Sequence, residues 1–146
     1  MPVLEAVGRG VTRLQGAPSS ANVVKLAGNF LIASMINALG EAFALTQKAG
    51  VARETFLDVF SKVFAHSPIF ENYAKVIANQ AYEPAGFKLS LGLKDLRLAL
   101  AAAESLGVPM PQASLVRDQF LTAVAKGKGD FDWSAIARLA AERSGL

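Results

Sequence analysis

The chain has 146 residues, which suits one domain, and with 52% hydrophobic and 18% charged residues it has the composition of a folded rather than a disordered protein. Its net charge is +3, and its lysines and arginines are scattered along the sequence. They do not form the cluster of basic residues that is typical of nucleic-acid-binding proteins. The absence of cysteine excludes disulfides, thiolate metal sites and cysteine nucleophiles.

The first 19 residues differ in character from the rest. Residues 2–7 are compatible with the end of a helix, and Gly10–Leu14 (GVTRL) with a short strand that has no second strand nearby to pair with. The beginning of the chain has no long apolar core and carries Glu5 and Arg9, which is not the pattern of a signal peptide. We therefore expect a cytoplasmic protein whose first segment is an element separated from its sheet.

A long helix is predicted from Ala21 to Lys48, with Ser19 or Ser20 as its N-cap and Gly50 as its stop signal. It would span roughly 40 Å, which is typical of a central element around which others pack. Its apolar stretch LAGNFLIASMINALG is shorter than the ~20 residues a bilayer needs and contains Asn29 and Asn37. We therefore expect a helix buried in protein rather than a membrane span.

Helical spacing of apolar residues, with Gly and Pro at the boundaries, predicts further helices along the rest of the chain. The expected segments are Arg53–Phe64, Pro68–Gln80, Leu89–Leu106, Pro111–Lys126 and Asp132–Arg143, the last capped by Asp132. The fold class is therefore expected to be all-α, a helical bundle around one long central N-terminal helix.

Polar residues recur every four positions on the long helix. Lys25 and Asn29 are adjacent on its surface and can share one site, whereas Asn37 and Glu41 lie farther round it. One interpretation is structural, with these groups bonded to neighbouring helices or exposed. The other is that Lys25 faces a cleft as a proton donor, with its pKa lowered by apolar surroundings, while Asn29 orients a bound group.

A second candidate is the pair Lys94 and Asp95, with Phe87 in the preceding turn. Composition alone favours a simpler interpretation, in which Lys94 and Asp95 form a solvated charged turn and Phe87 is a core aromatic. His66 is the single histidine and cannot build a multi-histidine metal site, so no metal is expected.

The segment VVKLAGNFLIASMINALGEAFALTQKAGV resembles the opening helix of the C-terminal domain of β-hydroxyacid dehydrogenases. This family includes 3-hydroxyisobutyrate dehydrogenase, tartronate semialdehyde reductase and glyoxylate/succinic semialdehyde reductases, and the domain is of the 6-phosphogluconate dehydrogenase C-terminal type. GFKLSLGLKDLRLALAAAESLGVPMP and the final GDFDWSAI resemble two later blocks of the same domain, in the same order. Two positions differ from the family pattern. SSAN stands where the family has glycines before the lysine, and Gly28 stands where it often has an additional asparagine.

The resemblance implies a role for each candidate residue. Lys25 would be the catalytic general acid/base, Asn29, Phe87 and Asp95 would bind substrate, and Lys94 would lie near the nicotinamide. The cofactor would be NAD or NADP, and the substrate a small hydroxyacid or semialdehyde.

The resemblance also sets the domain organisation. No GxGxxG motif occurs, so residues 1–19 are interpreted as the end of a Rossmann domain plus a linker, and 20–146 as the helical substrate and dimerisation domain. We expect the isolated chain to be inactive and to form a homodimer, without nucleic-acid or membrane partners. The alternative is a non-catalytic helical dimerisation module.

Overall fold

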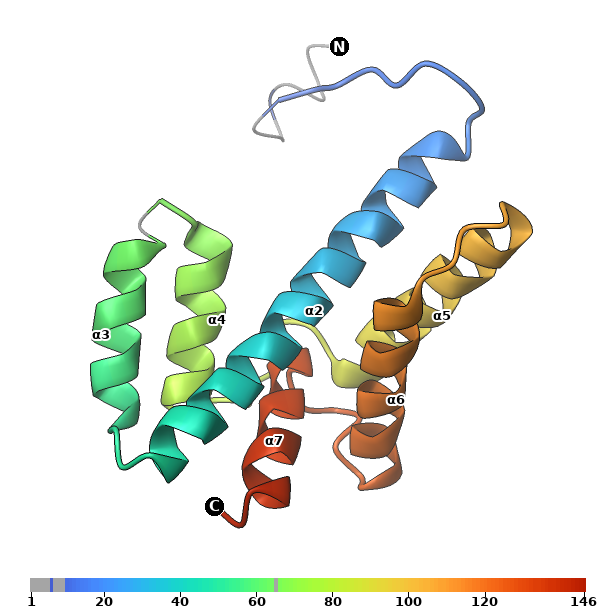
Figure 1. Cartoon of the computed structure of the whole chain (residues 1–146). Coiled ribbons are helices and arrows are strands. Elements are labelled where there is room, and N and C mark those ends of the chain that lie inside the picture. Colours follow the sequence, from blue (N-terminus) through green and yellow to red (C-terminus); the bar gives the residue numbers. More distant parts are fainter. Residues whose placement is uncertain (1–5, 7–9, 65) are drawn as a thin grey trace.

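The computed structural model describes residues 6, 10–64 and 66–146. This part of the chain contains helices and one isolated β-bridge, between Lys88 and Asp132, but no strand. One long helix, α2 (Ser20–Lys48), crosses the molecule diagonally in Figure 1, and the shorter helices lie on both sides of it. The predicted all-α fold and its long central helix are confirmed.

The shorter helices begin close to the predicted positions, and most end one or two residues earlier than predicted. They are α3 (Arg53–Val63), α4 (Pro68–Ala78), α5 (Leu89–Ser105), α6 (Pro111–Ala125), the 3-10 helix η1 (Trp133–Ile136) and α7 (Ala137–Arg143). Pro68 and Pro111 open their helices, where a missing backbone N–H costs little. Asp132 caps the last segment as expected, because its side chain accepts the N–H of Ser134 at 3.0 Å.

The two ends of α2 compare differently with prediction. Gly50 has a φ of +80° and lets the chain leave the helix, and the N–H groups of Gly50 and Val51 donate to the carbonyls of Gln47 and Thr46 at 2.9 Å each. At the other end Ser19 stands at the N-cap position, but its side chain makes no capping hydrogen bond. The physical reason is that Ser19 is already helical (φ −71°, ψ −14°), whereas a capping hydroxyl needs an extended backbone.

The prediction of a strand at Gly10–Leu14 is wrong for the described chain. These residues are exposed and have no strand assignment. Extended backbone needs a neighbouring strand to satisfy its N–H and carbonyl groups, and the described residues provide none. The helix end predicted at residues 2–7 lies outside the described residues, except for Ala6, which is helical.

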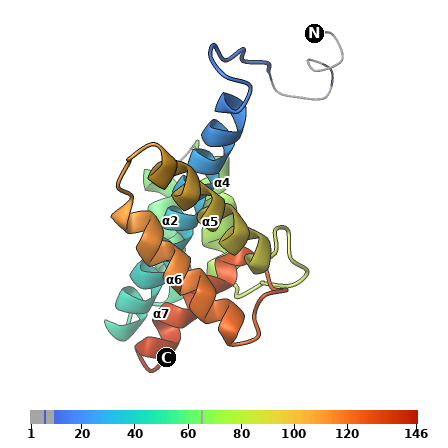
Figure 2. The ribbon, with the colours of Figure 1, turned by 90° about the vertical axis from the view of Figure 1, so that its right-hand side faces the viewer.

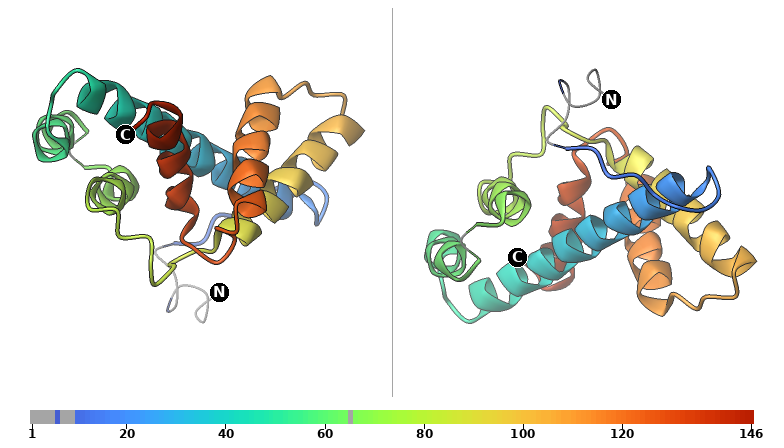
Figure 3. Two further views of the ribbon diagram at one scale, coloured as in Figure 1. Left: turned by 90° about the horizontal axis from the view of Figure 1, so that it is seen from below. Right: turned by 90° about the horizontal axis from the view of Figure 1, so that it is seen from above.

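The helices form two groups on opposite sides of α2. Seen from above and below, α3 and α4 lie together on one side and α5 and α6 on the other (Figure 3). From a third direction α5 and α6 cross in front of α2 (Figure 2). The last helix, α7, packs beside the C-terminal half of α2. The central helix α2 therefore contacts α3, α4, α5, α6, η1 and α7.

The core lies where α2, α5, α6 and η1 meet. Ile36, Leu96 and Phe120 are completely or almost completely buried there. The contact between α2 and α7 requires a glycine, because a Cβ atom on Gly40 would lie 2.6 Å from the Cα of Ala137. This close approach fixes α7 against the central helix.

By length and composition alone α2 could also cross a membrane, since an 18-residue window has a mean hydropathy of 1.5. Core helices of soluble proteins pass the same test. In the described chain α2 is the element on which the other helices pack, although only 22% of that window is buried.

Candidate active site

The N-terminal third of α2 meets the first half of α5 through a cluster of charged and polar side chains. Lys25 and Asn29, one helical turn apart on α2, both contact the carboxylate of Asp95 on α5. Lys25 Nζ lies 3.1 Å from Asp95 Oδ2, and Asn29 Nδ2 donates to the same oxygen at 2.6 Å. The structure therefore joins two of the sequence motifs that lie about 70 residues apart.

Lys94 is the fourth member of this cluster. Its Nζ lies 3.4 Å from Asp95 Oδ1, close enough for an ion pair. Asp95 Oδ1 is buried and accepts no hydrogen bond in the described chain. The two α2 side chains therefore contact Asp95 Oδ2, while Lys94 lies near Oδ1.

The exposure of these side chains divides the cluster into an inner carboxylate and two outer amines. The side chain of Asp95 is 3% exposed, while those of Lys25 and Lys94 are 59% and 58% exposed. The interpretation of Lys94–Asp95 as a solvated turn is therefore wrong for Asp95. The sequence did contain a signal, because Asp95 lies at helical spacing from the small residues Gly92 and Ala99, which the structure shows on the buried face of α5.

Burial raises the pKa of the Asp95 carboxyl, since a buried charge loses hydration. Hydrogen bonds from Lys25 and Asn29 and the positive charge of Lys25 outweigh burial, so the pKa lies below its ordinary value. The carboxylate stays ionised at neutral pH and holds the amine of Lys25 in place. Lys25 thus lies against a carboxylate and solvent, not in the apolar surroundings expected for it.

Phe87 lies just before α5 and packs on η1. Its ring meets that of Trp133 edge-on with centroids 4.8 Å apart, and its carbonyl accepts the N–H of Trp133 at 2.8 Å. These described contacts do not include Lys25 or Asn29. Phe87 is at the same end of α5 as Lys94 and Asp95, but it is not part of their hydrogen-bonded cluster.

Asp132 fixes the turn that carries Phe87, a role the sequence did not indicate. Its Oδ2 accepts the N–H groups of Gly86 and Phe87 at 3.1 Å each, while Oδ1 accepts the N–H and hydroxyl of Ser134. The carboxylate is buried and is satisfied by these four donors. Asp132 therefore connects the segment before α5 to the last helical segment.

The other polar pair of α2 lies elsewhere, as its helical position predicts. Asn37 donates to Glu41 at 3.0 Å in an exposed pair, several turns away from Lys25. No group of three or more potential metal ligands occurs among the described residues.

Comparison with known proteins decides the family. Residues 19–140 match the family model described as "NAD-binding of NADP-dependent 3-hydroxyisobutyrate dehydrogenase". The chain belongs to this family. That match includes every member of the Lys25, Asn29, Lys94 and Asp95 cluster as well as Phe87.

Relatives within the dehydrogenase family agree. The chain is 40% identical to the "uncharacterized oxidoreductase YfjR" of Bacillus subtilis (strain 168), covering 94% of this chain and 48% of that protein. It is 32% identical to "glyoxylate/succinic semialdehyde reductase 1" of Arabidopsis thaliana, covering 93% and 46%. A crystal structure of 3-hydroxyisobutyrate dehydrogenase from Salmonella typhimurium superposes with a TM-score of 0.86 at 31% identity, covering 94% and 48%. The dehydrogenase-family chain thus spans about half the length of the relatives it matches.

Proposed function

We propose that this chain is the C-terminal, proton-transferring domain of an NAD(P)-dependent 3-hydroxyacid dehydrogenase or semialdehyde reductase. The observation that carries the proposal is the meeting of Lys25 and Asn29 with Asp95 inside the family match. In this proposal residues 20–146 form the helical domain, and residues 1–19 are the end of a nucleotide-binding domain plus a linker.

The side chains have separate tasks in the proposed reaction. Lys25 gives a proton to the carbonyl oxygen of a semialdehyde, or takes it from the hydroxyl of a hydroxyacid in the reverse direction. Asn29 hydrogen-bonds the substrate, and Asp95 keeps both α2 side chains oriented while Phe87 lines the approach. A Lys25 side chain that is 59% exposed and tethered to a carboxylate supports this, because it is both positioned and reachable.

The nicotinamide cofactor supplies or accepts the hydride when it is bound. Lys94 is suited to lie beside it, because its side chain is 58% exposed and its amine lies 3.4 Å from Asp95 Oδ1, the oxygen that Lys25 and Asn29 do not contact. The chain contains no glycine-rich phosphate-binding motif, so we propose that a second domain binds the cofactor and that this chain alone is inactive.

The test is an assay of NAD(P)H oxidation with glyoxylate and succinic semialdehyde, the substrates in the name of the Arabidopsis relative. A protein that carries a dinucleotide-binding domain before this chain should turn over at least one small semialdehyde. The 146-residue chain alone should show no turnover. Activity of the isolated chain would contradict the division of labour between the two domains.

An apolar groove supports the proposed homodimer. It is equally compatible with the alternative function, a helical module that only dimerises. A groove of about 400 Å³ between α2, α3 and α4 is lined almost entirely by apolar side chains: Met35, Ala38, Leu39, Ala42, Phe56, Phe60, Phe64, Ser67 and Phe70. Phe64, one of these lining residues, is 44% exposed, and Leu31 on α2 and Val63 on α3 are each 65% exposed. Exposed apolar surface on this scale is typical of a subunit interface.

We therefore expect light scattering at micromolar concentration to give twice the 15.4 kDa mass of the chain. Phe64→Glu should give a monomer, because a carboxylate cannot be buried in the groove. Leu115→Glu on α6, which replaces an apolar residue that is 52% exposed and lies outside the groove, should remain dimeric. A wild-type chain of 15.4 kDa at every concentration would contradict the dimer.

We place the protein in the cytoplasm, with neither membrane nor nucleic acid as a partner.

A further inference from the structure

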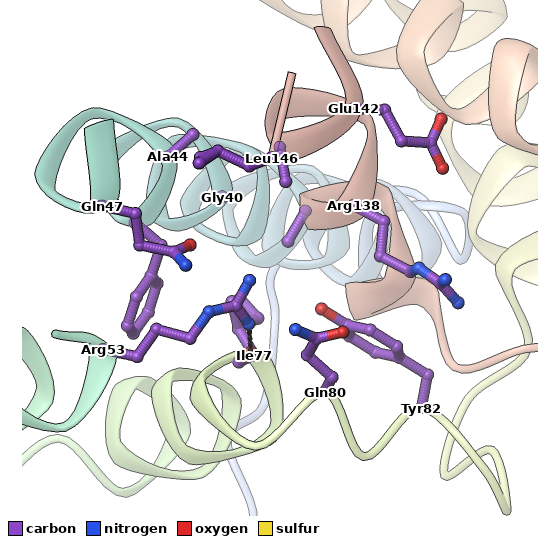
Figure 4. Close-up of a pocket in the computed structure, with 13 residues that line it drawn as sticks. Gly40, Ala44, Gln47, Arg53, Ile77, Gln80, Tyr82, Arg138, Glu142 and Leu146 are labelled. Carbon is purple, nitrogen blue, oxygen red and sulfur yellow. Dashed lines mark hydrogen bonds between the residues drawn. The ribbon is translucent and has the colours of Figure 1, made fainter. Parts of the chain in front are cut away.

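A pocket at the opposite end of α2 from Lys25 contains two arginines. It has a volume of about 220 Å³ and lies between the C-terminal half of α2, the end of α4 and α7. Figure 4 shows the polar side chains that line it, among them Gln47, Arg53, Gln80, Tyr82 and Arg138. Gln47 follows Lys25 by 22 residues on one helix, or roughly 33 Å, so this pocket is separate from the proposed active site.

The two arginines have no acidic partner in the described part of the chain. Neither Arg53 nor Arg138 forms an ion pair there, and Arg138 makes no side-chain hydrogen bond. Glu142 reaches the rim of the pocket, but Figure 4 shows its carboxylate turned away from Arg53. It is paired with Lys126 at 2.6 Å and Lys128 at 2.8 Å, so the pocket keeps an excess of positive charge.

The hydrogen-bonding groups of Arg53 are only partly used. Nη1 donates to the carbonyl of Ile77 at 3.2 Å. With the amide of Gln80 turned so that its oxygen faces Arg53, that oxygen accepts Nη1 at 2.9 Å and Nη2 at 3.1 Å. One N–H of Nη2 and the N–H of Nε then remain, and these two form the side-on fork that binds both oxygens of a carboxylate.

Two further polar groups of the pocket support an anion ligand. The side-chain oxygen of Gln47 is buried without a partner, and rotation of the amide would present its NH₂ donor there instead. Burial raises the pKa of the Tyr82 phenol, which therefore keeps its O–H donor at neutral pH. Figure 4 shows the Tyr82 hydroxyl beside the amide of Gln80, facing the same space as Arg53.

The remaining wall is apolar, and this selects among anions. Phe43, Ala44 and Ile77 contribute carbon surface next to the arginines. A ligand with a carboxylate head and a short carbon chain would satisfy both kinds of wall, whereas inorganic phosphate would leave the apolar part covered only by water.

We propose that this pocket is a binding site for a small carboxylate, held by Arg53 and Arg138 and separate from the Lys25 cluster. The inference does not depend on the proposed dehydrogenase activity. It assigns a second ligand site to the distal end of the bundle, where the carboxylate meets the guanidinium fork of Arg53 and the alkyl chain meets Phe43 and Ile77.

The test is NMR titration of the ¹⁵N-labelled 146-residue chain with butyrate and, separately, with inorganic phosphate at constant ionic strength. The Nε–Hε signals of Arg53 and Arg138 should shift and saturate with butyrate. The dissociation constant for phosphate should be at least about tenfold higher than that for butyrate. Shifts that do not saturate, or equal affinity for phosphate, would overturn the proposal.

Variants provide the second part of the test. Arg138→Gln should weaken butyrate binding by about tenfold and leave the fold intact, because Arg138 forms no ion pair or side-chain hydrogen bond within the described residues. Arg53→Lys, which keeps the charge but removes the fork, should weaken it similarly. Arg143→Gln, an exposed arginine on the same helix outside this pocket, should bind butyrate as the wild type does. Undiminished binding by Arg138→Gln would overturn the assignment.

Discussion

In a protein that joins a nucleotide-binding domain to this chain, replacing Lys25 with methionine should lower kcat of the proposed semialdehyde reduction by about 10²- to 10⁴-fold. Methionine fills a similar volume but cannot exchange a proton with the substrate oxygen. The Lys25 side chain is 59% exposed, so its loss does not disturb the core. Steady-state NAD(P)H oxidation measures the change in kcat, and circular dichroism of the variant checks that the fold is retained.

Two controls separate proton transfer from simple charge. Lys48→Met removes an exposed lysine from the other end of α2 and should leave kcat unchanged. Lys25→Arg keeps a cation beside Asp95 but holds its proton too tightly for acid–base work, so it should be as slow as the methionine variant. Full activity of Lys25→Arg would remove Lys25 from the proton-transfer step.

Replacing Asp132 with alanine destabilises the domain by about 3 kcal/mol. The carboxylate is buried and accepts four hydrogen bonds, two of them from the backbone of Gly86 and Phe87. Alanine would leave these N–H groups without an acceptor and release the turn before α5 from η1. Urea unfolding followed by circular dichroism measures the loss.

The control is Asp130→Ala, which removes a neighbouring carboxylate that is 86% exposed and pairs with Lys88 at 2.7 Å. Exposed pairs of this kind contribute little, so its unfolding midpoint should match that of the wild type. Unfolding of the two alanine variants at the same urea concentration would contradict this structural role of Asp132.

Local signals made the helices predictable. Helical spacing of apolar residues, prolines at first positions and glycine at a helix end each depend on residues within one or two turns. Gly50 illustrates this, because its positive φ and the hydrogen bonds that close α2 involve only its near neighbours. The prediction of a strand at Gly10–Leu14 was wrong because a strand is stabilised by a partner strand, which need not be close in sequence.

The candidate site was predictable in its parts but not in its assembly. Lys25 and Asn29 were placed together because one helical turn separates them. The contact of both with Asp95 joins helices distant in sequence, and it depends on how α2 and α5 cross. For Asp132 the local cap was predicted, whereas its bonds to Gly86 and Phe87 span more than 40 residues and were not.

The most direct test of the proposed function is transfer of deuterium from the cofactor to a small semialdehyde. The complete protein, with a nucleotide-binding domain before this chain, is incubated with glyoxylate or succinic semialdehyde and with NADH or NADPH deuterated on either face of C4. Mass spectrometry should find deuterium on the hydroxyl-bearing carbon of the product from one face only, and Lys25→Met should form this labelled product about 10²- to 10⁴-fold more slowly. A folded protein that binds the cofactor but gives no labelled product from either face would contradict the proposal that Lys25 serves a hydride-transfer reaction.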